Sequence, residues 1–473
     1  MVSRRKFIGT TSLGLAGMAV SKSVLGSLLP GNEFVSNRPP AGKRNFESKA
    51  VEALIAEVKT KIHDPELAWL FENCFPNTLD TTVIPGKPGK PDTFVITGDI
   101  RAMWLRDSSA QVWPYIPLLN KDPELKRLIA GVICRQVKCI QLDPYANAFL
   151  YGDEISEWKT DYTEMKPGVH ERKFEVDSLC YPIRLAHGYW KTTGDPTVFD
   201  DDWQKAMELI YKTFTEQQRK TTHGSYSFKR LTSTQADTPP GNGYGNPINP
   251  VGLICSVFRP SDDATIFPFL VPSNFFAVQS LRQLAEMEEQ IRSNHAFAAK
   301  LKTLAGEVET ALMKYAVATH LEYGKILAYE VDGFGNQLFM DDANAPSLLS
   351  LSYLGCLEPG NELYQNTRRF LLSNNNPYFY QGKAAKGIGS PHTPVDKIWP
   401  IALSMQALTS KEPAEISYCL KTLNSTHAGK GFMHESFNKD NPADYTRNWF
   451  AWANTLFGEL VIKVYHEHPE LLK

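Results

Sequence analysis

The sequence lacks the cysteine and histidine patterns of metal sites. Its seven cysteines are scattered without a CxxC pair, and its eleven histidines form no HExxH or comparable ligand spacing. A zinc site is therefore not supported, and metal-dependent hydrolysis is disfavoured. We expect no metal and no cofactor, and we interpret most of the cysteines as small core residues.

The sequence also lacks an excess of charge and a long apolar run. Its 50 lysines and arginines nearly balance 52 aspartates and glutamates, giving a net charge of -2. Because proteins that bind phosphate backbones normally carry a basic excess, nucleic acid is not expected as the main partner. The apolar run at residues 9–20 is too short and too rich in Gly and Ser for a stable membrane span.

The extreme N-terminus is the exception to the even charge distribution. Ser3-Arg4-Arg5-Lys6-Phe7-Ile8 precedes that weakly apolar run, which is the layout of a twin-arginine export signal. We therefore expect residues 1–30 to form a signal and leader, with the cleavage point left open, and the mature protein to be exported, to the periplasm. No change in composition marks a boundary later on, so residues 31–473 are interpreted as one catalytic domain.

Helical periodicity dominates the rest of the chain, and three Asp-Pro pairs, at 64–65, 122–123 and 195–196, are typical of helix starts. Besides the helix from Asp64, helices are predicted at residues 46–62, 108–119, 123–142, 175–193, 196–219, 273–315, 345–354, 361–372, 396–409, 413–423 and 446–466. Convincing strands are few, and they are predicted at residues 94–96, 225–229 and 326–329. About a dozen helices without a βαβ rhythm predict an all-α fold, with paired helices in a toroid.

Four long connections carry too little hydrophobic periodicity to be helices. They are rich in Trp, Tyr, His, Asp and Asn rather than in Ser, Lys and Glu, and they span residues 232–263, 329–345, 374–395 and 425–444. Loops of this length in a compact domain are usually functional or disordered, and their composition favours the functional interpretation.

The segment Thr97–Tyr115 concentrates charge and aromatic surface in one turn and helix. It holds Asp99, Trp104, Arg106 and Asp107. Carboxylates and guanidinium groups can each bind two sugar hydroxyls, and an indole can cover the C–H face of a pyranose. A buried Arg/Asp network that only orders a helix start is the alternative, and the segment alone does not separate the two.

Two further carboxyl candidates lie in the long connections. Asp262 and Asp263 follow Arg259, and Glu435 lies between aromatic residues in a glycine-bounded loop. Inverting glycosidases use such a pair, an acid and a base about 6.5–9.5 Å apart. The alternatives are a helix cap at residues 261–262 and a solvated loop glutamate at 435.

Three other positions are weaker candidates. Asp177 opens a helix and either faces a pocket or caps the helix, while His392 lies in a proline-bounded turn. Asp341-Asp342 resembles the start of a metal–diphosphate motif, but no acid follows at the required offset.

Together these segments resemble glycoside hydrolase family 125, the metal-independent exo-α-1,6-mannosidases. The similarity lies in GDIRAMWLRDSSAQVWPY, FEVDSLCYPIRLA, FRPSDDA, VPSNFFAV, GIGSPHTP, MHESF and YTRNWFAWAN, in this order. The resemblance implies an (α/α)6 barrel (a six-hairpin toroid) with long active-site loops and few short strands, and an inverting mechanism.

The resemblance also implies roles for the candidate residues. Asp262 would be the general acid, with Asp263 as the alternative, and Glu435 the general base. Arg106 and Asp107 would hold the terminal sugar. The remaining substrate-binding candidates are Trp104, Asp99, Asp263, Asp177, His392 and His434.

The resulting hypothesis is an exo-acting, inverting α-mannosidase that removes non-reducing terminal α-1,6-linked mannose from mannan or N-glycan fragments. Its partner is an oligosaccharide, and the oligomeric state is left open. Two alternatives come from other classes: a metal-dependent isoprenoid cyclase on a similar helical toroid, and a glycan-binding protein without catalysis.

Overall fold

A computed structural model describes residues 34–87, 89–152 and 154–473. The predicted twin-arginine segment and its leader lie outside these residues. In the described part of the chain, no helix combines the length and the apolar character needed to cross a membrane.

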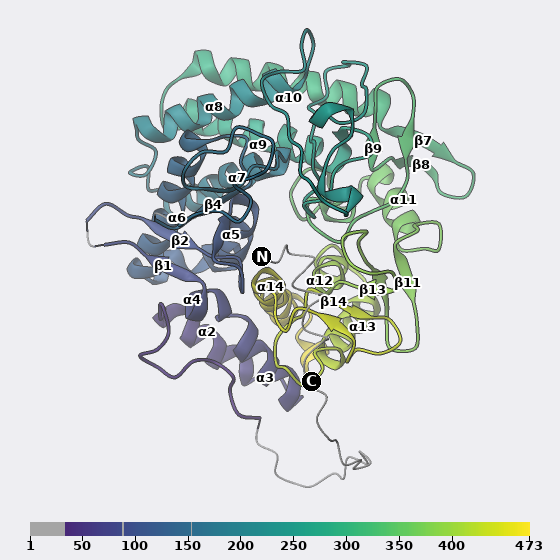
Figure 1. Ribbon diagram of the computed structural model, residues 1–473. Coiled ribbons are helices and arrows are strands. Elements are labelled where there is room, and N and C mark those ends of the chain that lie inside the picture. Colours follow the sequence, from purple (N-terminus) through teal and green to yellow (C-terminus); the bar gives the residue numbers. More distant parts are fainter. Residues whose placement is uncertain (1–33, 88, 153) are drawn as a thin grey trace.

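Six inner elements form a closed ring in which each contacts the next and the last returns to the first (Figure 1). In chain order they are α5 (Leu105–Val112), α7 (Val176–Thr193), α9 (Val271–Gln290), η4 (Leu349–Leu351), α12 (Pro400–Leu408) and α14 (Ala451–Glu467). The chain follows the ring once, so its C-terminal helix packs beside the helices that begin it. This arrangement is the predicted six-hairpin toroid.

Outer helices cover the ring: α3 contacts α14, α6 contacts α7, α10 contacts α9, α11 contacts η4, and α13 contacts α12, while α8 packs on α6. The elements outside the ring are α2 (Lys49–Lys59), α3 (Pro65–Cys74), α4 (Asn77–Thr81), η1 (Trp113–Lys121), α6 (Pro123–Leu142), α8 (Asp201–Gln217), η2 (Gln235–Asp237), η3 (Gly241–Gly243), α10 (His295–Tyr315), α11 (Glu362–Leu371), α13 (Pro413–Ser425) and η5 (Pro469–Leu472).

The described strands are two to four residues long and pair antiparallel in small sheets of two or three. They are β1 (Val83–Pro85), β2 (Thr93–Val95), β3 (Ala102–Trp104), β4 (Ala148–Leu150), β5 (Val169–Glu171), β6 (Phe269–Leu270), β7 (Val317–His320), β8 (Gly324–Leu327), β9 (Glu330–Val331), β10 (Gln337–Leu338), β11 (Phe379–Gln381), β12 (Lys386–Ile388), β13 (Lys397–Ile398), β14 (Ser436–Asn438) and β15 (Tyr445–Thr446). The strands predicted at residues 94–96 and 326–329 correspond to β2 and β8.

The strand predicted at residues 225–229 is wrong. Only Lys229 pairs there, in a single bridge to Tyr162. The backbone N–H of Ser225 instead donates to the Glu216 side chain, and that of Phe228 donates to the Gly243 carbonyl. The backbone hydrogen bonds of this stretch therefore serve loop contacts rather than a ladder.

Two of the three Asp-Pro pairs begin helices as predicted. Asp64 and Asp122 each accept two backbone N–H groups of the first turn, with proline at the first position. The third prediction is wrong, because Asp195 caps only a turn through the Thr197 N–H and α8 begins five residues after Pro196 with Asp200 as its cap.

Two other predicted helices need correction. The helix predicted at residues 273–315 is two helices, because Ser293 has a left-handed backbone and Asn294 caps α10 by accepting the Phe297 N–H. The helix predicted at residues 345–354 is a short 3₁₀ turn, η4, in which Ser347 and Ser350 exchange side-chain and backbone hydrogen bonds.

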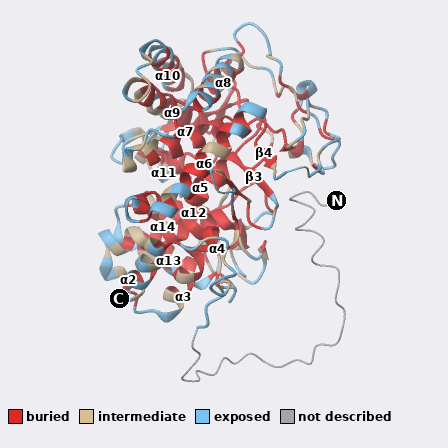
Figure 2. Ribbon diagram, turned by 90° about the vertical axis from the view of Figure 1, so that its left-hand side faces the viewer, coloured by how far each residue is buried: buried red, intermediate tan, exposed pale blue. Residues whose placement is uncertain are grey.

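The core lies along the inner ring, where buried residues concentrate (Figure 2). One apolar cluster extends from Val51 to Leu472. All eight residues of α5 are buried, including the charged pair Arg106 and Asp107. Because buried charges are costly unless they are paired, the contacts of this helix start identify a specialised part of the molecule.

Candidate active site

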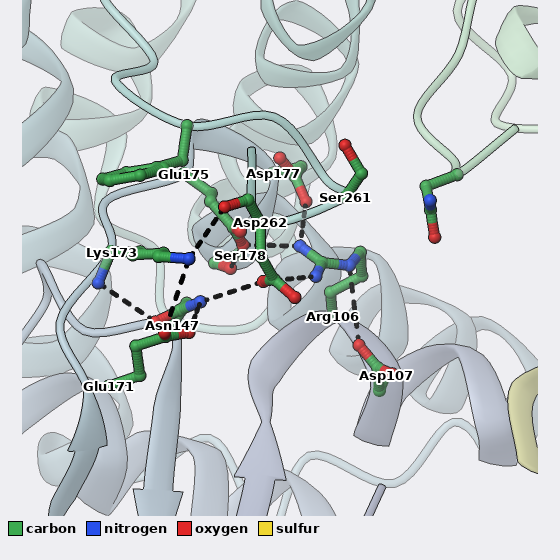
Figure 3. A network of polar contacts seen from close by, with 12 residues as sticks. Arg106, Asp107, Asn147, Glu171, Lys173, Glu175, Asp177, Ser178, Ser261 and Asp262 are labelled. Carbon is green, nitrogen blue, oxygen red and sulfur yellow. Dashed lines mark hydrogen bonds and ion pairs between the residues drawn. The ribbon is translucent and has the colours of Figure 1, made fainter. Parts of the chain in front are cut away.

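The start of α5 holds Arg106 in the middle of a cluster of carboxyl groups (Figure 3). Its Nη1 donates to Glu175 Oε2 at 2.5 Å and to Asp177 Oδ2 at 3.1 Å. Its Nη2 donates to Asp262 Oδ1 at 3.4 Å, and its Nε lies 3.5 Å from Asp107 Oδ2. The structure therefore brings together three predicted carboxylates and one that the sequence analysis did not select.

Burial and the opposite charges of this cluster have opposing effects on each pKa value. Burial raises the pKa of Glu175 well above its ordinary value; Arg106 opposes this effect, while Asp262 and Asp177 add to it. Burial also raises the pKa of Asp177 despite Arg106. The pKa of Arg106 is raised because its carboxyl neighbours outweigh its own burial, so the guanidinium stays charged.

Asp262 lies in a tight turn between the paired residues Phe258 and Ala264. Its φ of 65° is left-handed, a backbone conformation that aspartate tolerates better than most residues. Its carbonyl oxygen accepts from Lys173 Nζ at 2.9 Å, and its Oδ1 also accepts from Asn147 Nδ2 at 3.2 Å. Contacts from three separate segments thus hold this residue in place, and two of them, from Arg106 and Asn147, reach its carboxyl group.

Asp263 has a different environment from its neighbour. Its Oδ1 lies 3.0 Å from Nδ1 of His392, and both side chains are buried. The His392 ring packs edge-on against Trp399. Among the described residues, Nε2 of His392 has no hydrogen-bond partner. The two adjacent aspartates therefore belong to separate networks, one around Arg106 and one with His392.

Glu435 is buried immediately before β14, and it contacts the segment around Asp99 through one arginine. Its Oε1 accepts from Nη1 of Arg447 at 3.4 Å. The same guanidinium pairs with Asp99 and donates to the Thr97 carbonyl at 3.4 Å. Oε2 of Glu435 has no hydrogen-bond partner in the described part of the chain. This arrangement leaves one carboxylate oxygen able to accept a proton from a bound water.

Gly98 lies beside this arginine in a left-handed backbone conformation. Its φ is 61°, and an added Cβ would lie 3.5 Å from Arg447 Nη2 and 3.6 Å from the Trp449 ring. Both are ordinary contact distances, so the left-handed backbone rather than lack of space favours glycine at this position. The segment Thr97–Tyr115 therefore links both catalytic candidates, contacting Glu435 through Arg447 and Asp262 through Arg106.

His434 and Trp104 lie at the edges of these networks. The His434 ring stacks on Tyr445 at 3.8 Å, and its Nδ1 donates to the Arg447 carbonyl at 3.0 Å. Burial lowers the pKa of His434 to about 4, so the ring is neutral near neutral pH. Trp104 is buried at the end of β3 and packs edge-on against His170. Their roles as sugar ligands stay predictions.

The Asp341-Asp342 pair serves protein contacts. Asp341 accepts the backbone N–H groups of Leu348 and Leu349, and burial raises its pKa to about 8. Asp342 accepts from Ser261 Oγ at 2.8 Å, beside the proposed acid. Among the described residues, no group of three or more His, Cys, Asp and Glu side chains is arranged to hold a metal ion.

Sequence reasoning missed four residues that hold these networks together. They are Asn147, Lys173, Glu175 and Arg447. Two signals were available, because Glu175 opens FEVDS and Arg447 lies in YTRNW, both within blocks that carry the family resemblance. The local sequence pattern around these residues indicated no role, since the partners that link them to Arg106, Asp262 and Asp99 are distant in sequence.

A family model described as metal-independent alpha-mannosidase (GH125) matches residues 64–462. The chain belongs to this family. Membership confirms the predicted enzyme class, a glycoside hydrolase, and rules out the cyclase alternative.

Two relatives show how much of the GH125 chain is shared. A metal-independent α-mannosidase from Streptococcus pneumoniae, solved in a non-productive complex with α-1,6-mannobiose, is 42% identical; the match covers 89% of this chain and 99% of that one, with a TM-score of 0.85. The meiotically up-regulated gene 157 protein of Schizosaccharomyces pombe is 40% identical over 92% of this chain and 89% of its own.

A bacterial glucoamylase complexed with acarbose shares the fold at much lower identity. It is 11% identical with a TM-score of 0.55, and the match covers 88% of this GH125 chain and 59% of the glucoamylase. The all-α toroid predicted from helix periodicity, and the six-hairpin form implied by the family resemblance, are thus confirmed by the similar GH125 structure, and the distant structure shares the fold.

Replacing Asp99 with asparagine is expected to lower kcat by roughly 10–100-fold with little change in KM. The asparagine keeps an oxygen that can accept from Arg447 but carries no charge, so the ion pair that holds the guanidinium against Glu435 is lost. Steady-state kinetics on a mannoside would measure kcat and KM separately. Asp92→Asn is the matched control, because Asp92 pairs with Arg135 and Lys138 between β2 and α6. A rise in KM with unchanged kcat would instead make Asp99 a direct sugar ligand.

Proposed function

We propose that the protein is an exo-acting, inverting α-mannosidase that removes non-reducing terminal α-1,6-linked mannose. The observation that carries the proposal is the 42% identical α-mannosidase, which was solved with α-1,6-mannobiose. Fragments of mannan or of N-glycans are the proposed substrates.

The two catalytic roles go to carboxyl groups from different loops. Asp262 protonates the glycosidic oxygen, and Glu435 deprotonates the water that attacks the anomeric carbon from the opposite face. Asp262 is preferred over Asp263 because its carboxyl group joins Glu175 and Asp177 around Arg106, whereas the carboxyl group of Asp263 is paired with His392. Oε2 of Glu435, which has no hydrogen-bond partner among the described residues, suits a base.

Arg106 and Asp107 are proposed to recognise the end of the glycan. Both lie buried in the first turn of α5 and face the same cluster as Asp262. Charged groups held this rigidly can bind outer hydroxyls of a terminal sugar in one orientation. Trp104, Asp177, Asp263, His392 and His434 complete the proposed substrate-binding set, while Asp99, first selected as a sugar ligand, is proposed to position Arg447.

Linkage specificity and metal independence can be tested together. The protein is expected to release mannose from α-1,6-mannobiose at an unchanged rate in excess EDTA, and to hydrolyse α-1,2- and α-1,3-mannobiose more slowly. Released mannose would be quantified by anion-exchange chromatography. Tight binding of α-1,6-mannobiose without release would support the glycan-binding alternative, and loss of activity in EDTA would contradict the assignment of the reaction to side chains alone.

We also propose export by the twin-arginine route to the periplasm. The support is the arrangement of Arg4-Arg5 and the weakly apolar run that follows. Replacing both arginines with lysine is expected to retain the full-length protein in the cytoplasm, which fractionation and immunoblotting would measure. Unchanged export of that variant would contradict this route.

A further inference from the structure

Asp262 has a backbone conformation that its surroundings must maintain. Its φ of 65° is left-handed, which residues other than glycine rarely adopt. Inside the turn, the Asp262 N–H donates to the Arg259 carbonyl at 2.9 Å, and the Arg259 N–H donates to the Asp263 carbonyl at 2.7 Å. Neither bond involves the carbonyl or the carboxyl group of Asp262. These two groups are held by contacts from outside the turn.

Lys173 holds the backbone of this turn. Its Nζ donates to the carbonyl oxygen of Asp262 at 2.9 Å, and its side chain is only 3% exposed. That carbonyl belongs to the peptide group that joins Asp262 to Asp263, so the contact restrains the plane of this peptide group. The plane in turn restrains the directions in which the two aspartate side chains leave the backbone. Lys173 therefore helps to direct the two aspartates into their separate networks.

Asn147 holds the carboxyl group of the same aspartate. Its Oδ1 accepts from the backbone N–H of Lys173 at 3.1 Å, so its NH2 group faces the opposite way. There Nδ2 donates to Asp262 Oδ1 at 3.2 Å and to Glu171 Oε2 at 3.3 Å. Lys173, Asn147 and Asp262 thus form a closed ring of hydrogen bonds. Figure 3 shows Lys173 and Asn147 on one side of Asp262 and Arg106 on the other.

The ammonium group of Lys173 is itself fixed. It lies 3.5 Å from Glu171 Oε1 on β5, 3.6 Å from Asp237 Oδ1 on η2, and 5.2 Å from the centre of the Phe258 ring. Moving it would leave buried charges unpaired, so it has few other positions. The alternative interpretation is that Lys173 serves only to neutralise the two carboxylates.

We propose that Lys173 and Asn147 clamp Asp262 and thereby position the general acid, Lys173 through the backbone and Asn147 through the carboxyl group. The inference rests on the proposed function, in which Asp262 protonates the leaving group. Proton transfer requires the acid to lie within hydrogen-bond reach of the glycosidic oxygen, so a shift of about 1 Å can lower the rate by up to 10²-fold. Neither positioning residue needs to contact the sugar.

Two substrates separate a misplaced acid from a general loss of structure. Lys173→Met removes the ammonium group at similar side-chain length and is expected to lower kcat on α-1,6-mannobiose by about 10–100-fold. Turnover of α-mannosyl fluoride is expected to be nearly unchanged, because fluoride leaves without a proton from Asp262. A role limited to neutralising Glu171 and Asp237 would instead lower both activities equally.

Asn147→Ala tests the clamp without changing its charges. The variant loses the contact with the Asp262 carboxyl group, while Lys173 keeps its carboxylate partners. It is expected to lower kcat on α-1,6-mannobiose by about tenfold and to keep turnover of α-mannosyl fluoride. Should Lys173→Met fail to fold, the ratio of the two activities in Asn147→Ala decides alone.

Lys397→Met and Asp262→Asn provide the controls. Lys397 is another buried lysine whose Nζ donates to a backbone carbonyl, that of Asp444 at 2.7 Å, and its variant is expected to keep the wild-type ratio of the two activities. Asp262→Asn is expected to lose mannobiose turnover while keeping fluoride turnover, which defines the behaviour of a missing acid.

The outcomes distinguish the clamp from the proposed function. If either clamp variant lowers both activities equally, or leaves mannobiose turnover at the wild-type level, the clamp is wrong although the proposed function stands. If Asp262→Asn keeps mannobiose turnover, the acid assignment fails, and the clamp with it.

Discussion

Replacing Glu435 with glutamine is expected to lower kcat on α-1,6-mannobiose by about 10²–10⁴-fold, with KM changing little. Glutamine keeps the shape of the side chain and a carbonyl oxygen that can accept from Arg447, but its amide nitrogen cannot take a proton from water. The attacking water then lacks a base in the transition state. Steady-state kinetics on the disaccharide would measure the loss.

A small anionic nucleophile provides a direct check of this role. Azide needs no deprotonation, so it is expected to restore turnover of α-mannosyl fluoride by Glu435→Gln and to yield β-mannosyl azide. Glu459→Gln is the matched control, since Glu459 is a half-buried glutamate that accepts from Tyr353 two turns into α14. Near-normal turnover by Glu435→Gln would show that the base lies elsewhere.

Replacing Arg106 with methionine is expected to lower the free energy of unfolding by about 3–5 kcal/mol at pH 7 and to abolish measurable activity. The substitution leaves Asp107, Glu175, Asp177 and Asp262 buried without the cation that they share. Denaturant unfolding followed by fluorescence would give the change in stability. Arg282→Met is the control, because the Arg282–Glu309 pair is solvent-exposed and is expected to contribute less than about 1 kcal/mol.

The decrease in the free energy of unfolding caused by Arg106→Met should depend on pH in a defined direction. The folded-state pKa values of Glu175 and Asp177 are already raised, and removing Arg106 takes away the charge that lowers them. Carboxyl groups with raised folded-state pKa values stabilise the fold below their ordinary pKa and lose that contribution as pH rises. The difference between Arg106→Met and wild type is therefore expected to shrink from pH 7 toward pH 4. An equal difference at both pH values would assign the effect to packing alone.

Much of the fold could be predicted because its signals are local. Asp64 and Asp122 followed by proline begin α3 and α6 as expected, since a cap and its helix turn are neighbours in the chain. The toroid of paired helices was predicted from the number of helices and from the absence of a βαβ rhythm. At Asp195 the same signal failed, because the aspartate cap was satisfied within a turn before the helix began.

The candidate site could be predicted only in its parts. Asp262 and Glu435 were selected from unusual loop composition and from family resemblance, and both are buried in charged networks. Glu175 was interpreted only as a helix opener, and Arg447 was given no role. Glu175 and its partner Arg106 are 69 residues apart, and Arg447 and its partner Asp99 are 348 residues apart. Helix periodicity and caps carry no information about which distant loops meet.

The most direct test of the mechanism is the anomeric configuration of the first mannose released. Incubation of wild-type protein with α-1,6-mannobiose and EDTA would be followed by proton NMR before mutarotation mixes the anomers. Attack by water from the face opposite the leaving group, with Glu435 as base and Asp262 as acid, predicts initial release of β-mannose. Initial release of α-mannose would contradict the inverting assignment of these two carboxyl groups.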